Sequence, residues 1–361
     1  MTRVLVDGLA LATPSSNRGI GTYLRSVLEP MVGGALDISV LAPAGTPVPA
    51  GTVLVPSIRR AAERRSYYEQ LLRLGRDVRR VGPDVFFSPG TDPPLAPGVP
   101  WVQTLHDVIP LAYPGAGYRA EQWRWRARGR LIRRAAAVLA DSQHTADDAV
   151  RWLGLDPARL HVVHLGVDPR FVPPMARAPA DPPHLLYVSA YGVHKGYGEA
   201  FEVVSALAER GLPHRLKVVG TVARRMKPIV RMQANAVRHA ERIDLVGVVD
   251  FDELLRLYQQ ADAVVVTSRY EGFGLPAVEA MATGTPLVAF ANSSLPEVVG
   301  DGGVLVPDGD VAAFADAVAS VVTDRARWAE LSAAGLARAA HFSWSRTAAE
   351  TAAVLRSVAP S

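Results

Sequence analysis

Residues 263–290 constrain the fold of this 361-residue chain more than any other segment. Ala263–Val266 is a short apolar run of the kind that forms a buried parallel strand, and Pro286–Phe290 is a second one. Between them lie Gly272 and Gly274 and then Pro276, which suits the first position of a helix because proline lacks an N–H that would be unbonded there. A strand, a loop, a helix and a strand in this order predict an α/β domain with a parallel sheet.

The same loop and helix carry two carboxylates, Glu271 and Glu279. Gly272 and Gly274 let the backbone approach a ligand closely, and the unbonded N–H groups of the first helical turn attract an anion. Carboxylates are poor phosphate ligands, but they accept hydrogen bonds from the hydroxyl groups of a sugar. An anion site flanked by two such carboxylates predicts a sugar nucleotide as the ligand.

The rest of the chain repeats this alternation, which predicts two doubly wound α/β domains. We expect the first domain over residues 1–170, a Pro/Ala-rich linker over 171–183 and the second domain over 184–344. The strands expected in the first domain are Val4–Asp7, Ile38–Ala42, Thr52–Val55, Val85–Ser88, Trp101–Leu105, Val138–Ala140 and His161–His164. Those expected in the second are Leu185–Val188, Leu216–Val219, Ile243–Val246, Ala263–Val266, Leu287–Ala289 and Val304–Val306, followed by a helical tail over 312–358 that is interrupted at 342–344.

The composition of the chain excludes several classes of site and of protein. The absence of cysteine excludes disulfides, thiol catalysis and zinc–thiolate sites. The net charge of +4 is too small to predict nucleic-acid binding, although the basic residues concentrate in the first half. No signal peptide precedes the first strand, and no apolar run approaches the roughly 18 residues of a spanning helix, so we expect a cytoplasmic protein that is at most peripheral to the inner face of the cell membrane.

The segment Glu271-Gly-Phe-Gly-Leu-Pro-Ala-Val-Glu279-Ala-Met-Ala resembles the paired-glutamate motif of the retaining glycosyltransferases of family four. The resemblance covers nearly the whole chain through weaker motifs at Val6–Gly8, Arg18–Leu24, Leu105–Leu111, Ala140–Thr145, His164–Asp168, Lys195-Gly196 and Val246–Val249. It implies the GT-B fold, in which two Rossmann-like domains, one for the acceptor and one for the nucleotide-sugar donor, face a central cleft. It also implies that the last helix, residues 345–361, joins the first domain. Mannosyl- and rhamnosyltransferases are the members that the chain resembles most.

The resemblance assigns Lys195, which follows the first strand of the second domain, to the diphosphate of the donor. Members of the family usually carry an arginine next to this lysine or a few residues before it, and this chain has none there. His194 or one of Arg224 and Arg225 would then have to replace that second cation.

The other implied roles belong to residues of both domains. Glu271 is expected to hold hydroxyl groups of the transferred sugar, and Glu279 those of the ribose. The backbone amides of Phe273, Gly274 and Leu275 are expected to face the distal phosphate or the sugar, and the base is expected near Gly247 and Val249. His106 is expected to contact the donor sugar. Gly19 and Gly21 either approach the phosphate or the acceptor, or form a simple turn into a helix.

Two Asp-x-Asp segments, residues 250–252 and 308–310, match the metal-binding pattern of other transferases. Asp252 and Asp310 each precede a helical stretch, so helix capping explains them better. We therefore expect no essential metal. No cofactor is expected either, because the dinucleotide-binding glycine pattern does not follow the first strand.

Residues 118–134 are rich in arginine and tryptophan, and a second arginine cluster runs from Arg59 to Arg80. Such segments lie on an anionic membrane or bind an anionic acceptor. A solvated helix with its tryptophans half in the core is the alternative.

These features predict a retaining, metal-independent hexosyltransferase. Its donor would be a GDP-, UDP- or dTDP-sugar, and its acceptor a hydroxyl group on a glycan, a glycolipid or a secondary metabolite. An epimerase of the same fold, which would turn over the donor without an acceptor, and a non-catalytic sugar-nucleotide-binding protein are the alternatives.

Overall fold

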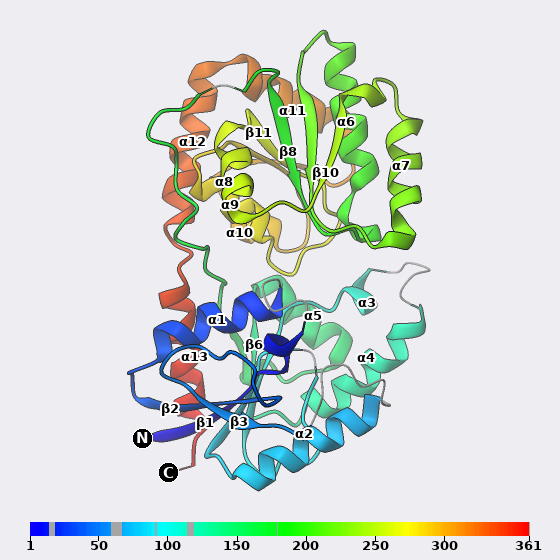
Figure 1. The fold of residues 1–361 in the computed structure, drawn as a ribbon. Helices are drawn as coiled ribbons and strands as arrows, with labels where there is room; N and C mark the ends of the chain where they lie inside the picture. Colours follow the sequence, from blue (N-terminus) through cyan, green and yellow to red (C-terminus); the bar gives the residue numbers. More distant parts are fainter. Residues whose placement is uncertain (14–18, 59–66, 91, 114–118, 179, 361) are drawn as a thin grey trace. The chain divides into compact units, whose positions relative to one another are not determined.

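The computed structural model describes residues 1–13, 19–58, 67–90, 92–113, 119–178 and 180–360. The chain divides into two compact units, Met1–Gly166 with Ser343–Ser361, and Val167–Phe342. Each unit is built on its own parallel sheet with helices on both faces (Figure 1). Residues 59–66, the first part of the second arginine cluster, lie outside the described residues.

The first unit contains a seven-stranded sheet in the order β3-β2-β1-β4-β5-β6-β7. Its strands are β1 (Thr2–Asp7), β2 (Leu36–Ala42), β3 (Val53–Pro56), β4 (Val85–Ser88), β5 (Trp101–Leu105), β6 (Ala137–Ala140) and β7 (Leu160–Val162). Its helices are η1 (Leu9–Ala12), α1 (Ile20–Met31), α2 (Tyr67–Val81), α3 (Ile109–Ala112), α4 (Arg119–Ile132), α5 (Gln143–Leu153), η2 (Pro157–Arg159) and α13 (Trp344–Ser357). Every residue of β4, β5 and β6 is buried, as expected for parallel strands covered by helices on both faces.

The last helix, α13, packs against α1 in this first unit. The Thr347 hydroxyl donates a hydrogen bond to the carbonyl of His164 at 2.7 Å. At Gly166 a Cβ atom would lie only 2.1 Å from the backbone nitrogen of Trp344, so glycine is required for this close approach. The C-terminal helix is therefore built into the first sheet unit although it follows the second one in sequence.

The second unit contains a six-stranded sheet in the order β10-β9-β8-β11-β12-β13. Its strands are β8 (His184–Val188), β9 (Arg215–Val219), β10 (Ile243–Gly247), β11 (Ala263–Val266), β12 (Leu287–Ala291) and β13 (Val304–Pro307). Its helices are η3 (Val193–Lys195), α6 (Tyr197–Glu209), η4 (Arg224–Met226), α7 (Lys227–Ala236), η5 (Ala240–Arg242), α8 (Phe251–Gln260), α9 (Leu275–Ala282), α10 (Leu295–Val299), α11 (Val311–Thr323) and α12 (Arg325–Ala339). Side chains of α6, α7 and α11 form one apolar core with the sheet, while α8 and α9 cover its other face (Figure 1).

Every strand expected from the sequence is present, and no strand end differs by more than two residues. The helical tail differs more. Asp324 divides its first part into α11 and α12, because the Asp324 carboxylate accepts hydrogen bonds from the N–H groups of Ala326 and Arg327 and so caps a new helix. Within the described residues, all helices are too short or too polar to span a bilayer.

Candidate functional site

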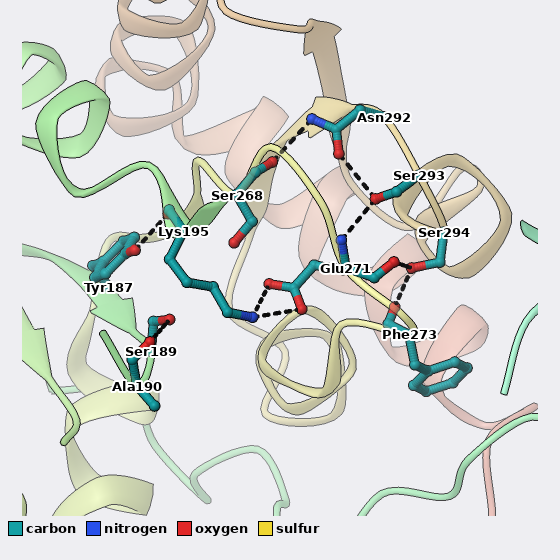
Figure 2. Close-up of polar contacts among 10 residues, drawn as sticks. All are labelled: Tyr187, Ser189, Ala190, Lys195, Ser268, Glu271, Phe273, Asn292, Ser293 and Ser294. Carbon is teal, nitrogen blue, oxygen red and sulfur yellow. Dashed lines mark hydrogen bonds and ion pairs between the residues drawn. The ribbon is translucent and has the colours of Figure 1, made fainter. Parts of the chain in front are cut away.

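The candidate site lies at the carboxyl edge of the second unit's sheet, where doubly wound folds bind their ligands. Lys195 ends the η3 turn after β8, and Glu271 lies in the loop between β11 and α9. The Lys195 ammonium donates hydrogen bonds to both carboxylate oxygens of Glu271, at 2.8 Å each (Figure 2). The side chains are 19% and 11% exposed, so this ion pair is largely shielded from water. The structure thus joins the residues predicted to bind the diphosphate and the sugar.

A glycine allows the loop of Lys195 to lie against the loop after β11. Gly196 has φ +68°, and a Cβ atom there would lie 1.9 Å from the carbonyl oxygen of Thr267. The Thr267 hydroxyl donates to the Gly196 carbonyl at 2.7 Å, and the Tyr187 hydroxyl donates to the Lys195 carbonyl at 2.6 Å. The backbone that carries Lys195 is therefore fixed on both sides.

Three residues directly after β12 hold the backbone of Glu271. The Glu271 N–H donates to the Ser293 hydroxyl at 2.9 Å (Figure 2). The buried Ser294 hydroxyl lies 3.0 Å from the carbonyl oxygens of both Glu271 and Phe273 and donates to them. Ser293 in turn donates to the Asn292 side chain at 3.0 Å. The sequence analysis did not identify these residues, although their place at the carboxyl end of a strand is a signal that could have found them.

The helix that follows Glu271 begins at Leu275, one residue before the predicted start at Pro276. Gly274 is its N-cap, with φ +97°, and Pro276 is the second residue of α9. A Cβ atom at Gly274 would lie 2.9 Å from the Leu295 side chain, so the residue combines a left-handed backbone with a tight contact. The amides of Phe273, Gly274 and Leu275 are therefore located at the positive end of α9.

Glu279 lies on the second turn of α9, and its partner is a tyrosine of α8. The Tyr258 hydroxyl donates to a Glu279 carboxylate oxygen at 2.7 Å. Burial raises the pKa of Glu279 to about 7, the Tyr258 hydrogen bond opposes this rise, and the charge of Asp168 adds to it. Glu279 therefore changes its charge near neutral pH, unlike an ordinary glutamate.

His194 was one of the residues predicted to replace the missing second cation. Its side chain is buried, and burial together with the charge of Lys195 lowers its pKa to about 4. The imidazole is neutral at neutral pH. Arg224 and Arg225 are both exposed in η4, so they remain the candidates for that role.

A pocket of about 240 Å³ opens between the ends of β9 and β10 and helix α7. Gly247, which was predicted to lie near the base, lines it together with Gly220 and Val248. The Gly220 N–H donates to the Gly247 carbonyl at 2.7 Å, and Gly247 has φ +84°. Val249 is not among the residues that line this pocket.

In the first unit, His106 directly follows β5 and lies between two acceptors. Its Nδ1 is 2.7 Å from the Asp141 carboxylate, and its Nε2 is 2.9 Å from the Pro89 carbonyl oxygen. Burial lowers the pKa of His106, but the Asp141 charge and both hydrogen bonds outweigh burial and raise it to about 9. His106 is therefore a cation at neutral pH. In the same unit, Gly19 caps α1 and Gly21 is buried in its first turn.

The Asp-x-Asp segments have the capping role only in part. Asp310 caps α11 by accepting the N–H of Ala313. The cap of α8 is Asp250, which accepts the N–H of Glu253, whereas Asp252 lies inside the first turn. The assignment of Asp252 as the cap was therefore wrong. Among the described residues, no three His, Asp or Glu side chains converge into a metal-binding group.

Comparison with known proteins places the chain in a family. Residues 17–171 match the family model described as Glycosyltransferase Family 4, and residues 173–338 match the one described as Glycosyl transferases group 1. D-inositol 3-phosphate glycosyltransferase 1 of Catenulispora acidiphila is 33% identical over 72% of this chain and 67% of that protein. The chain belongs to glycosyltransferase family 4. It spans about two thirds of the length of the curated relatives it matches.

Solved structures show the same fold for this family 4 member. Sucrose-phosphate synthase from Thermosynechococcus elongatus has a TM-score of 0.80 and 20% identity, covering 99% of both chains. Anabaena HepE in complex with UDP-glucose has a TM-score of 0.76 and 18% identity, covering 99% of this chain and 100% of HepE. The fold is GT-B, with two Rossmann-like parallel-sheet domains, as predicted.

The structure thus brings together the predicted residues Lys195, Glu271, Phe273, Gly274 and Leu275 at one sheet edge. Glu279 lies on the helix that begins there, and Gly247 lines a pocket at the ends of neighbouring strands. His106, Gly19 and Gly21 belong to the other unit. Sequence reasoning missed Tyr258, because only the fold brings it to Glu279, 21 positions away.

Proposed function

We propose that this glycosyltransferase moves a hexosyl group from a nucleotide sugar to a hydroxyl acceptor with retention and without a metal. The observation that carries the proposal is the shielded Lys195–Glu271 ion pair beside the N-terminus of α9. A leaving diphosphate needs positive charge and N–H donors, and these two features supply both. Glu271 and Glu279 then serve as acceptors for hydroxyl groups of the sugar and the ribose.

The nature of the donor is part of this proposal. HepE, which shares the fold, is solved with UDP-glucose, and the Gly247 pocket offers a place for a base at the same sheet edge. We infer that the donor is a UDP-, GDP- or dTDP-sugar bound with its diphosphate at Lys195. A mannosyl or rhamnosyl donor is the prediction that follows from the sequence motifs.

Thermal unfolding in the presence of UDP, GDP and dTDP tests donor binding. A ligand at about 100 times its dissociation constant adds roughly 2.7 kcal/mol to the unfolding free energy, which raises the melting temperature measurably. The nucleotide that stabilises the protein selects the nucleotide sugars for turnover assays. If no nucleoside diphosphate raises the melting temperature, the proposal is wrong.

Turnover assays with and without acceptors separate the alternatives. A transferase releases nucleoside diphosphate faster when a suitable hydroxyl compound is added, whereas an epimerase converts the donor at the same rate without one. A binding protein does neither. The intact Lys195–Glu271 pair argues against a non-catalytic binding protein.

We further propose that α4 contacts an anionic membrane surface. Trp123 is 51% exposed, while Trp125 is 4% exposed and packs in the core. Trp123, Arg126 and Arg130 are three and four positions apart and exposed, so they share one face of the helix. An exposed tryptophan among arginines suits the interface of an anionic bilayer. Tyr118 lies outside the described residues.

A further inference from the structure

Ser293 has a backbone conformation that serine disfavours. Its φ is +47°, in the left-handed region, and among the described non-glycine residues only Ala96 and His239 share this feature. Such a conformation costs a residue with a Cβ atom about 1–2 kcal/mol. It persists where surrounding contacts require it, which is often at a functional site. The contacts of the Ser293 side chain are therefore the place to look for what keeps its backbone in this conformation.

The Ser293 hydroxyl uses both of its hydrogen-bonding capacities. It accepts the N–H of Glu271 at 2.9 Å and donates to Oδ1 of Asn292 at 3.0 Å. The Asn292 amide group donates to the Ser268 carbonyl at 2.9 Å (Figure 2). It also donates to Asp308 at 2.7 Å, so its own orientation is fixed. A chain of hydrogen bonds therefore starts at the backbone N–H of Glu271 and runs through Ser293 to the side chain of Asn292.

Glycine would remove the strain at this position but also the hydroxyl. The loop after β11 would then lose the acceptor of the Glu271 N–H. Glu271 is the residue whose carboxylate binds Lys195. The Ser294 contacts to the carbonyl groups of Glu271 and Phe273 would remain. The Ser293 hydroxyl thus bears on the position of Glu271, whereas the Ser294 contacts hold the rest of this loop without it.

We propose that Ser293 is a positioning residue, kept in a strained conformation because its hydroxyl fixes the Glu271 backbone in the geometry that donor-sugar binding requires. The inference rests on the proposed function for its effect on turnover, but not for its effect on Glu271. The expected signature is unusual for a structural residue, because replacing Ser293 with glycine should harm activity without harming stability.

Two substitutions separate strain from hydrogen bonding. Ser293→Gly loses the hydroxyl and the strain, so we expect a melting temperature equal to or above that of the wild type. Ser293→Ala loses the hydroxyl and keeps the strain, so we expect a lower melting temperature. Both variants should reduce kcat/KM for the nucleotide sugar about tenfold, while the affinity for the nucleoside diphosphate, which lacks the sugar, should stay within twofold.

Ala96→Gly is the matched control, because it relieves a φ of +51° in the first unit at an exposed residue. It should raise the melting temperature and leave kcat/KM unchanged. Hydrogen exchange at the Glu271 amide gives a readout that does not depend on activity. We expect exchange to be faster in both Ser293 variants and unchanged in Ala96→Gly.

The outcomes distinguish the two proposals. If the wild type turns over no nucleotide sugar while Ser293→Gly still accelerates exchange at Glu271, the proposed function fails and the positioning role stands. If exchange at Glu271 is unchanged in Ser293→Gly, or if kcat/KM is unchanged in an active enzyme, the positioning role is wrong.

Discussion

At the scale of single residues, Lys195 carries the clearest prediction. Lys195→Ala removes the cation proposed to stabilise the leaving diphosphate, so kcat should fall by about 10²-fold or more. Lys217→Ala is the matched control, since Lys217 is another of the three lysines and lies on β9 away from the Glu271 contact. Steady-state kinetics with circular dichroism to verify folding compare the two variants. Turnover like that of the wild type in Lys195→Ala would remove this residue from the site.

The raised pKa of His106 predicts that the stability of the folded protein depends on pH. Its pKa of about 9 in the folded protein lies above the ordinary value near 6.5. A raised pKa means that the stabilisation is fully present below about pH 6.5 and is lost as the pH rises through about 9, an effect on the order of 3 kcal/mol. Unfolding at several pH values should show this loss in the wild type but not in His106→Gln. An NMR titration of His106 with a midpoint below 7 would contradict it.

At the scale of elements, Glu271 lies in the loop before α9 and Glu279 lies within this helix. We propose that Glu271 binds the sugar of the donor and Glu279 its ribose. Glu271→Ala should spare the binding of nucleoside diphosphate and weaken that of the nucleotide sugar, because only the latter contains the sugar. Glu279→Ala should weaken both, because both ligands contain ribose. Calorimetry with the two ligands measures the difference. Equal losses for both ligands in each variant would overturn the assignment.

We expect the binding of nucleoside diphosphate to depend on pH through Glu279, which lies on the same helix. Burial raises the pKa of Glu279 to about 7, so its carboxylate becomes the stronger acceptor for ribose hydroxyl groups as the pH rises from 6 to 8. The affinity for nucleoside diphosphate should rise over this range by more in the wild type than in Glu279→Gln. The comparison cancels the titration of the ligand's own phosphate, which also occurs near pH 6.

The basic face of α4 predicts binding to vesicles. Each arginine near an anionic bilayer contributes about 1 kcal/mol, so the double substitution of Arg126 and Arg130 by serine should weaken binding roughly 30-fold at low salt. Serine at Arg325 and Arg327 of α12 is the matched control. Co-sedimentation with vesicles of anionic lipid measures both. No binding of the wild type at low salt would leave α4 as a solvated helix.

The elements were predictable because apolar runs and loop glycines are local signals. β4 and β5 have the bounds expected from the sequence, and the expected proline lies in the first turn of α9, one position after the start of the helix. The contacts that tune the site were not predictable in this way. Tyr258 reaches Glu279 from another helix, Asp141 reaches His106 from the loop after β6, and Ser293 reaches Glu271 from the loop after β12. Such pairs depend on strand order, which the sequence pattern leaves open.

At the scale of the whole molecule, the last prediction is stereochemical. We expect neither paired glutamate to act as a covalent nucleophile, because we assign both of them to hydroxyl groups of the donor, Glu271 to the sugar and Glu279 to the ribose. Retention then requires attack from the face of the leaving group, with the leaving phosphate taking the proton of the acceptor hydroxyl. The protein's part is to stabilise that phosphate with Lys195 and the N-terminus of α9, which needs no metal.

An α-linked nucleotide sugar should therefore give an α-linked product, at a rate that EDTA does not change. NMR of the anomeric centre of the product identifies the linkage, and parallel reactions with and without EDTA test the metal. A β-linked product would exclude front-face attack and demand a base that activates the acceptor from the opposite side. Loss of activity in EDTA, restored by Mg²⁺ or Mn²⁺, would instead assign a metal to the leaving phosphate. Asp250 and Asp308 would then be the first residues to substitute, because each begins an Asp-x-Asp segment.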